Sequence, residues 1–256
     1  MKHIVQRYWS TRIPGHMYGC PGFGDIVHSS LLTYLYGQAH NEPATLHIAS
    51  HQYNRNKPEI WDEVMQLFPT GTVFLNPHET PDDMTDLDFL NLVREQHPDA
   101  LLHYYKKYPG KLQQVLEPSF FVDEYIKTYP CLSASNPGDK ITLPEKFVTA
   151  QFDAGSNKRK LRKEQLESIF DKFKKQGYEI ITIGGEATDP LLRTATYAGY
   201  ALSHADYHIG VDSGYMHLAH VFLKPENIYL YTNRPEGKWE HHLKKFRDCG
   251  CKINVY

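Results

Sequence analysis

The sequence predicts an α/β protein made of two units, each built on a parallel sheet. In the second half, short apolar runs at residues 147–152, 178–183, 207–211 and 227–231 alternate with amphipathic stretches of helical period. Such alternation of strand and helix places the strands parallel, with right-handed crossovers. The first half repeats the alternation, and 256 residues, of which 41% are hydrophobic, suffice for two compact halves.

The helices of the second half have clear limits. A helix over residues 162–176 has apolar residues at three- and four-residue spacing and is expected to end at Gly177, a residue suited to a helix C-terminus. A second helix is expected over residues 190–204, and a third begins at residues 212–214. These helices connect the four expected strands.

The first half contains fewer clear patterns. Strands are expected near residues 16–20, 45–50 and 72–76, and helices over 25–36, 59–68, 82–96 and 111–129, the last interrupted at Pro118. Residues 131–144 are rich in turn formers and have no helical or strand period. We therefore expect one domain over residues 1–138 and another over residues 139–256.

The composition argues against several classes of protein. A formal net charge of −2 lacks the basic excess of proteins that coat nucleic acid. No apolar run approaches the roughly 20 residues that span a bilayer, and the N-terminus lacks the apolar core of a secretory signal, so a cytoplasmic protein is expected. Four irregularly spaced cysteines do not suggest a disulfide framework, so reduced thiols are expected.

The end of the chain contains residues that could bind a metal ion. The sequence has 15 histidines, and Cys249 and Cys251 follow His241 and His242. This order lacks the ligand spacing of known zinc modules. We therefore expect neither a metal nor another cofactor.

The most informative segment is GVDSGYMHLA, at residues 210–219. An apolar strand ends here and a helix begins, with Asp212 or Ser213 as its N-cap. The first N–H groups of a helix have no intrahelical partner, and the helix dipole favours negative charge there. Gly214 has no Cβ to obstruct close approach, so the junction can hold a phosphate. Capping alone is the alternative explanation of these residues.

Two motifs resemble one known family. GVDSGYMHLA is similar to the strand-DSG-helix signature of the ADP-heptose:lipopolysaccharide heptosyltransferases, glycosyltransferase family nine. GFGDIVHSSLLTYL, at residues 22–35, resembles the exit from that family's first strand. The resemblance implies a GT-B-like fold, in which two Rossmann-like α/β domains face a central cleft. Residues 1–138 would then form the acceptor side, and residues 139–256 would bind the nucleotide sugar.

The resemblance also implies a catalytic base. The aspartate of the family's GD motif, here Asp25 after Gly24, is regarded as the base that deprotonates the acceptor hydroxyl. Inverting glycosyl transfer needs such a base, because a neutral sugar hydroxyl attacks poorly. The alternative is that Asp25 only caps the following helix.

Basic residues follow the first strand of the second half. Residues 156–163 carry five basic side chains, although a helix N-terminus usually favours acidic ones. A diphosphate ligand explains this excess, and the resemblance makes Lys158 or Lys160 the lysine that contacts it. A solvated start of a helix is the alternative.

The remaining donor contacts are expected from two loops. Gly185 and Glu186 match the family's strand-GG loop beside the donor nucleoside, where Glu186 or Asp189 could accept hydrogen bonds from ribose hydroxyls. His217 could contact the donor phosphate or hold the loop at Asp212 in place. The expected donor-binding set is Gly24, Ser156, Lys158, Lys160, Gly185, Glu186, Asp212, Ser213, Gly214 and His217.

The expected function follows from this resemblance. It implies a metal-independent, inverting glycosyltransferase of lipopolysaccharide biosynthesis, which moves a sugar from a nucleotide-diphosphate donor, ADP-heptose-like or other, to a glycan or other hydroxyl acceptor. The acceptor could bring the protein to a membrane surface, and no nucleic-acid partner is expected. Three alternatives stay open: a nucleotide-sugar or glycan-binding module without transfer activity, a nucleotide-sugar hydrolase or epimerase of the same fold, and a flavodoxin-like or Rossmann domain of unrelated function.

Overall fold

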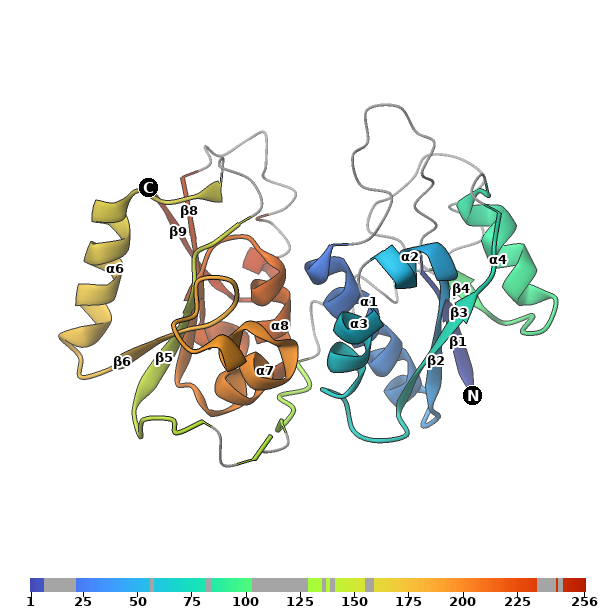
Figure 1. The fold of residues 1–256 in the computed structure, drawn as a ribbon, viewed down its shortest axis with the longest axis horizontal. Helices are drawn as coiled ribbons and strands as arrows, with labels where there is room; N and C mark the ends of the chain where they lie inside the picture. The colour runs from blue at the N-terminus through green and yellow to red at the C-terminus, as the bar shows by residue number, and fades with distance from the viewer. Residues whose placement is uncertain are drawn as a thin grey trace. The chain divides into compact units, whose positions relative to one another are not determined.

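The chain forms two α/β units. A computed structural model describes residues 1–6, 22–55, 58–81, 84–102, 129–134, 137–138, 141–154, 159–233, 243 and 246–256. The units are Met1–Thr128 and Tyr129–Tyr256. Each has a parallel sheet with helices on both faces (Figure 1), which confirms the predicted α/β class with a parallel sheet in each unit. The second unit begins earlier than the expected boundary, and Leu132 N donates to Val221 O at 3.0 Å within it.

The sheet of the first unit has the strand order β3-β2-β1-β4, with every pair parallel. Its strands are β1 (Lys2–Val5), β2 (Ala44–Ala49), β3 (Val73–His78) and β4 (Leu101–Leu102). Its helices are α1 (Phe23–Ala39), α2 (Ser50–Arg55), α3 (Pro58–Met65) and α4 (Asp86–Arg94). Figure 1 shows α1 and α3 on one face of this sheet and α4 on the other.

The predicted elements of the first half are confirmed where the structure describes them. The expected helices over 25–36, 59–68 and 82–96 correspond to α1, α3 and α4, and the strands over 45–50 and 72–76 correspond to β2 and β3. The strand expected near residues 16–20 and residues 111–128 of the last helix lie outside the described residues. The sequence analysis missed β1, α2 and β4.

The two faces of the first sheet differ in polarity. Side chains alternate between the faces along each strand, and Ile4, Leu46 and Ile48 are fully buried on the face toward α1. The face toward α4 carries an apolar cluster that includes Val5, Ala49 and Phe89. The same face carries His47, since it is two residues before Ala49. Burial, followed by the charges of His78, His3 and His97, lowers the pKa of His47 to about 3, so its imidazole is neutral.

The sheet of the second unit has the strand order β6-β5-β7-β8-β9, again with every pair parallel. Its strands are β5 (Phe147–Gln151), β6 (Glu179–Thr182), β7 (Tyr207–Gly210), β8 (Ile228–Thr232) and β9 (Lys252–Val255). Its helices are α6 (Lys163–Lys174), α7 (Ala195–His204), α8 (Gly214–Phe222) and two 3-10 turns, η3 (Pro190–Arg193) and η4 (Pro225–Asn227). Of these, β9 and η4 were not predicted.

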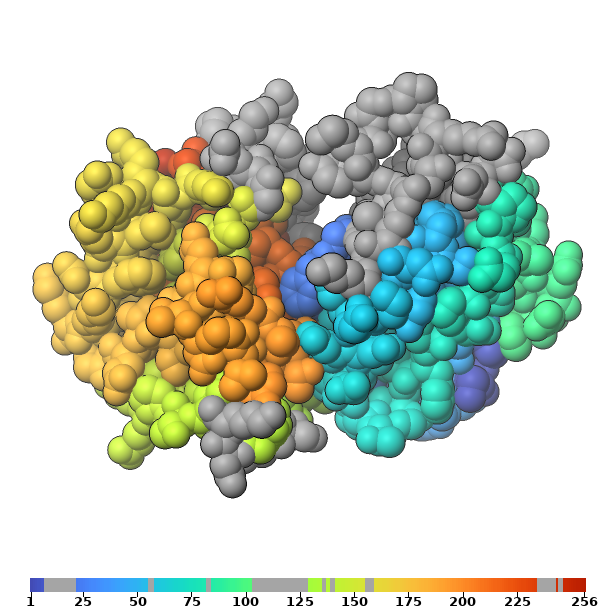
Figure 2. Space-filling view, viewed as in Figure 1, coloured from blue at the N-terminus to red at the C-terminus, as the bar shows by residue number. Residues whose placement is uncertain are grey.

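Two helix layers cover the second sheet. Ile169 and Phe173 of α6 pack in a cluster with Val148, Ala150 and Ile209 of the sheet. The opposite face is covered by α7 and α8 (Figure 1). The outer side of α6 forms part of the surface in Figure 2, where its charged residues are exposed. Within the described ranges, no helix is both long and apolar enough to cross a membrane.

Buried His208 predicts that acid destabilises the second unit. His208 on β7 is fully buried, its Nδ1 lies 3.0 Å from the Thr149 hydroxyl, and burial lowers its pKa to about 3. Below a pH of about 6.5 the unfolded chain binds a proton here, whereas the folded chain does not. This stabilisation is therefore complete above pH ~6.5 and is lost as the pH falls toward 3. We expect His208 alone to lower the free energy of unfolding by about 2 kcal/mol between about pH 7 and pH 5.

Urea unfolding across this pH range measures the effect. His208→Gln removes the titrating ring, so its stability should depend less steeply on pH than that of the wild type. His204→Ala is the matched control, because His204 is an exposed histidine of the same unit and its removal should leave the slope unchanged. A wild-type slope in His208→Gln would contradict the prediction.

Candidate functional site

The carboxyl ends of β5 and β7 meet where the strand order of the second sheet reverses. The chain leaves β5 toward α6 on one face and β7 toward α8 on the other. In open parallel sheets, ligands bind at this switch point, outside the carboxyl ends of the strands. Here β5 ends at Gln151 and β7 at Gly210. The Asp212 junction predicted from the sequence follows directly.

Gln151 joins the two strand exits. Its side chain is 3% exposed, and its Oε1 accepts a hydrogen bond from the Ser213 hydroxyl at 2.5 Å. Its Nε2 donates to the carbonyl of Asp153. A Cβ at Gly210 would lie 2.6 Å from the Gln151 carbonyl oxygen, so only glycine permits this close packing of β5 and β7. The position of the junction is therefore fixed by both strands.

The N-cap residue of α8 does not cap the helix with its own side chain. Ser213 holds the N-cap position in an extended conformation, but makes no side-chain cap hydrogen bond. Its hydroxyl is directed to Gln151 instead. The hydroxyl of the N-cap residue is thus used elsewhere, and the positive end of the α8 dipole can stabilise a ligand oxyanion beside it.

Arg159 places the basic segment at this junction. One terminal nitrogen of its guanidinium donates to the carbonyl of Asp212 at 2.8 Å. Its Nε is buried and has no hydrogen-bond partner among the described residues. A buried N–H of a charged group without a partner is costly, and a guanidinium matches the oxygens of phosphate. Ser156 and Lys158, two of the predicted donor contacts, lie outside the described residues.

The glycine pair after β6 packs against α8. Gly184 has a φ of +81°, and a Cβ there would lie 2.8 Å from the ring of Tyr215. The Tyr215 hydroxyl donates to the carbonyl of Arg193 at 3.1 Å, beyond the loop. The loop at Gly184 therefore packs against α8, whose first turn forms the Asp212 junction.

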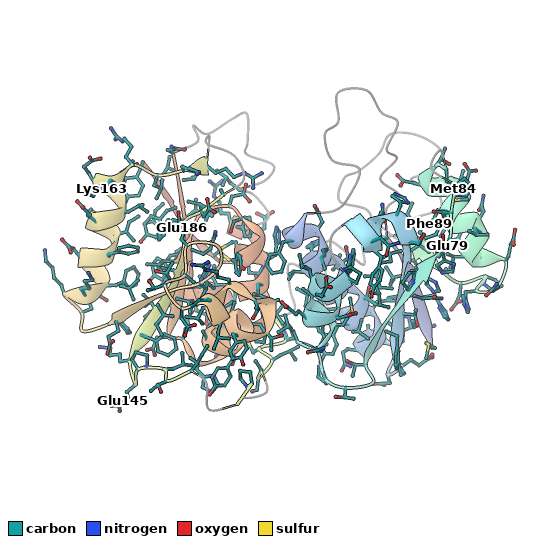
Figure 3. The ribbon with its side chains drawn as sticks, in the orientation of Figure 1. Glu79, Met84, Phe89, Glu145, Lys163 and Glu186 are labelled. Atoms are coloured by element: carbon teal, nitrogen blue, oxygen red, sulfur yellow. The ribbon has the colours of Figure 1, made fainter. Side chains whose placement is uncertain are left out.

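Three charged side chains gather beside Gly185. Lys160 Nζ lies 3.6 Å from Asp153 Oδ1, and a Cβ at Gly185 would lie 3.3 Å from Asp153 Oδ2. Burial, and then the negative charge of Asp153, raises the pKa of Glu186, while Lys160 opposes the shift. Figure 3 labels Glu186, which is exposed. The other candidate, Asp189, caps η3 by accepting from Leu191 N at 2.9 Å.

His217 lies deeper in the second unit. It is 9% exposed, and its ring centroid lies 5.6 Å from that of Phe246. His220, one turn later, has its Nε2 3.3 Å from the Sγ of buried Cys251. These contacts show His217 in aromatic packing, and its contact with a donor phosphate stays a prediction. His241 and His242 lie outside the described residues.

Asp25 lies in the first turn of α1, but it is not the N-cap. That position belongs to Gly22, and Asp25 Oδ2 accepts from Gly22 N at 2.9 Å. Gly24 is the second residue of the helix. The first sheet also reverses its strand order, between β1 and β4, and α1 is the helix that follows β1. The predicted base and the predicted phosphate junction thus each follow a central strand of their own sheet.

Of the second-unit residues predicted from the sequence, six lie near the carboxyl ends of the strands: Lys160, Gly185, Glu186, Asp212, Ser213 and Gly214. The structure adds three more residues there. Gln151, Arg159 and Asp153 were not singled out. Gln151 carries a detectable signal, because it is a polar residue at the end of an otherwise apolar strand. Arg159 was one of the five basic residues of segment 156–163, but nothing in that run distinguishes it from the adjacent lysines.

The fold matches that of a known glycosyltransferase. No family model matches the sequence, and no curated protein matches it significantly. The crystal structure of the glycosyl transferase family 9 from Veillonella parvula DSM 2008 is similar, with a TM-score of 0.52 and 10% identity over 100% of this chain and 85% of that chain. At this identity the similarity establishes the fold.

Two structures of a second protein, TibC, are more distant. One is the iron-containing dodecameric glycosyltransferase TibC from enterotoxigenic E. coli H10407, with a TM-score of 0.48 and 12% identity. The other is the heptosyltransferase TibC in complex with ADP-D-beta-D-heptose, with a TM-score of 0.46 and 11% identity. Each comparison covers 91% of this chain and 58% of TibC, so the chain spans less than two thirds of TibC.

Proposed function

We propose that this protein is a glycosyltransferase, which moves a sugar from a nucleotide-diphosphate donor to a hydroxyl acceptor with inversion. The observation that carries the proposal is the guanidinium of Arg159, which donates to the Asp212 carbonyl at the N-terminus of α8 and has a buried Nε, at the switch point of the second sheet. The similarity of fold to a family 9 glycosyltransferase supports the same conclusion.

The proposed transfer needs no metal ion at the diphosphate. As the bond between the sugar and the diphosphate breaks, negative charge develops on the leaving group. Arg159 and Lys160 supply positive charge at the junction, and the dipole of α8 adds a partial positive charge at its N-terminus. These groups provide the neutralisation that a divalent ion supplies in other transferases.

The nucleoside of the donor is assigned to the loop after β6. Glu186 is a carboxylate whose oxygens can accept hydrogen bonds from two ribose hydroxyls. Gly185, which is exposed beside it, has no side chain to prevent a close approach of the sugar ring. We place the diphosphate between this loop and Ser213.

Asp25 of the first unit is the proposed base. A carboxylate in the first turn of a helix is favoured in its ionised form by the helix dipole, and only the ionised form can take a proton. It would remove the proton of the acceptor hydroxyl as that oxygen attacks the anomeric carbon. A glycan is the proposed acceptor, and a lipid-linked glycan such as lipopolysaccharide would place the reaction at the cytoplasmic side of a membrane.

A thermal-shift screen with ADP-, GDP-, UDP-, CDP- and dTDP-sugars tests donor binding. A ligand at a hundredfold excess over its Kd should stabilise the protein by about 2.7 kcal/mol, if it binds only the folded form. Lys160→Ala should weaken the binding of the responding donor several-fold. Lys163→Ala is the control, because Lys163 (Figure 3) belongs to the same basic run but pairs with Glu167 on α6 at 3.7 Å.

Two results would contradict the proposed donor site. One is stabilisation by NAD or FMN and by none of the nucleotide sugars, which would indicate an unrelated Rossmann domain. The other is an equal loss of affinity in Lys160→Ala and Lys163→Ala, because the effect would then come from net charge and not from contact at the junction.

A further inference from the structure

The α4 face of the first sheet contains a group of histidines from separate strands. His3 is on β1 and His47 is on β2, and the register pairs His3 with Thr45, two residues before His47. The two rings therefore lie on the same face of adjacent strands. His97 follows α4, the helix that covers this face. Because both faces of a parallel sheet are normally apolar, packing does not explain imidazoles at these positions.

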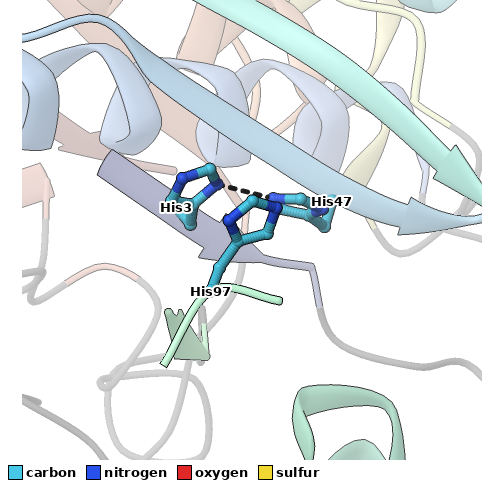
Figure 4. Close-up of side chains that lie close together, drawn as sticks. All are labelled: His3, His47 and His97. Carbon is cyan, nitrogen blue, oxygen red and sulfur yellow. Dashed lines mark hydrogen bonds between the residues drawn. The ribbon is translucent and has the colours of Figure 1, made fainter. Parts of the chain in front are cut away.

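The three imidazoles lie close together. His3 Nδ1 lies 3.0 Å from His47 Nε2, and the rings of His3 and His97 stack with centroids 3.7 Å apart. One ring nitrogen from each residue lies within 4.8 Å of those of the other two. Figure 4 shows the three rings close together, with the contact between His3 and His47 drawn as a dashed line. Among the described residues, these three histidines form the group of three or more histidine, cysteine or acidic side chains that has its ligand atoms this close together.

We propose that His3, His47 and His97 bind a divalent transition-metal ion, of which Zn²⁺ is the best match. Zinc binds imidazole nitrogen at about 2.0–2.1 Å, and two nitrogens in tetrahedral positions are then roughly 3.3 Å apart. The separation of 3.0 Å between His3 Nδ1 and His47 Nε2 is close to that value. The donor set is all nitrogen, which favours zinc, copper and nickel over magnesium and calcium.

His78 supplies the outer contact that a zinc-binding imidazole requires. Histidines that bind metal through one nitrogen usually donate the other N–H to a fixed partner, which sets the orientation of the ring. His47 directs Nε2 toward His3, and its Nδ1 lies 2.7 Å from His78 Nε2. The ring of His78 is itself held against Phe89 of α4, at a centroid distance of 5.7 Å. His47 is therefore oriented for the ion by its neighbour.

The burial of the three histidines indicates the side from which the ion reaches the site. His47 is fully buried, whereas His97 is partly exposed, so the ion enters from the side of His97. A water molecule can complete the tetrahedron on that side. The ion would join β1, β2 and the segment after α4, and thereby stabilise the first unit. This proposal concerns the first unit alone and does not depend on the proposed transfer reaction.

Titration of the full chain with Zn²⁺ tests the site. The protein is prepared without a histidine tag, stripped with a chelator, and titrated in a calorimeter. We expect one Zn²⁺ per chain and a rise in the unfolding temperature on binding. His97→Ala should weaken binding at least tenfold, and His78→Gln should weaken it by about 10- to 100-fold through loss of the outer contact. His204→Ala, which removes an exposed histidine of the second unit, should bind like the wild type.

Co²⁺ provides a readout that does not depend on stability. In place of Zn²⁺ it should give the strong visible absorption of a tetrahedral ion, and His97→Ala should lose that absorption while keeping the circular dichroism of the folded chain. Failure of the wild type to bind Zn²⁺ at micromolar concentration would overturn the proposal. Undiminished binding by His97→Ala would overturn it equally, and the histidines would then form only a hydrogen-bonded group.

Discussion

Asp25→Asn is expected to lower glycosyl transfer by a factor of about 10² to 10⁴, the contribution typical of a general base, while donor affinity stays near the wild-type value. An amide has the shape of the carboxylate and its oxygen can still accept from Gly22 N, but it cannot take a proton from the acceptor hydroxyl. Transfer of labelled sugar from the responding donor to a panel of glycan acceptors measures the loss, and calorimetry measures donor affinity.

The chain contains a matched control for this variant. Asp88 holds the same third position in α4 that Asp25 holds in α1, and its Oδ2 accepts from the N–H of the N-cap residue Thr85 at 3.2 Å. Removing either charge from a helix N-terminus costs roughly 0.3–1 kcal/mol of stability. Asp88→Asn should therefore reproduce the structural effect of Asp25→Asn and leave transfer unchanged.

The same assay separates the alternative functions. Undiminished transfer by the Asp25→Asn variant would show that Asp25 is not the catalytic base. Release of nucleotide by the wild type without any acceptor would indicate a hydrolase. Binding of a nucleotide sugar without turnover, across the whole acceptor panel, would indicate a binding module that shares the fold.

Arg159→Gln is expected to weaken donor binding by about 10- to 100-fold. A hydrogen bond to a charged group contributes about 1.5–3 kcal/mol, and each 1.4 kcal/mol corresponds to a factor of ten. Glutamine carries no charge, and its shorter side chain has no counterpart of the terminal guanidinium nitrogen that donates to the Asp212 carbonyl. Competition binding with the intact nucleotide sugar and with the free nucleoside measures the effect. Affinity for the nucleoside should change little, because the lost contacts are to the diphosphate.

Arg94→Gln is the control for Arg159. Its Nε donates to the carbonyl of Ala100 at 2.9 Å, so it also ties a guanidinium to the backbone, but in the first unit. Both substitutions remove one positive charge. Equal losses of donor affinity in the two variants would mean that general electrostatic attraction, and not a site at the Asp212 junction, explains the result.

Local sequence patterns predicted those elements that lie in an apolar run or show a helical period. The helices α6 and α8 and the strands β5 and β7 were each predicted to within two residues at their beginning, because apolar spacing and flanking glycines define them. In contrast, β1 and β9 each have four residues and include lysine and other polar side chains. Such strands form because a neighbouring strand offers hydrogen bonds, which no local pattern records.

The same limit applies to the candidate site. The junction at Asp212 was predictable because its parts are contiguous in the sequence. The contact of Arg159 with Asp212 joins residues 53 positions apart, and only folding brings them together. The three clustered histidines are dispersed between positions 3 and 97 in a chain with 15 histidines, so their meeting could not be anticipated.

The contact of Tyr215 with Gly184 has a consequence for substrate discrimination. Through this contact, the loop after β6 that is assigned to the nucleoside packs against α8, the helix assigned to the diphosphate. The hydrogen bond from the Tyr215 hydroxyl to the Arg193 carbonyl is a second contact between them. Neither piece can shift without displacing the other. The base and the phosphates of the donor would therefore be recognised together by one rigid surface. A nucleotide of the wrong length or shape would not fit this surface.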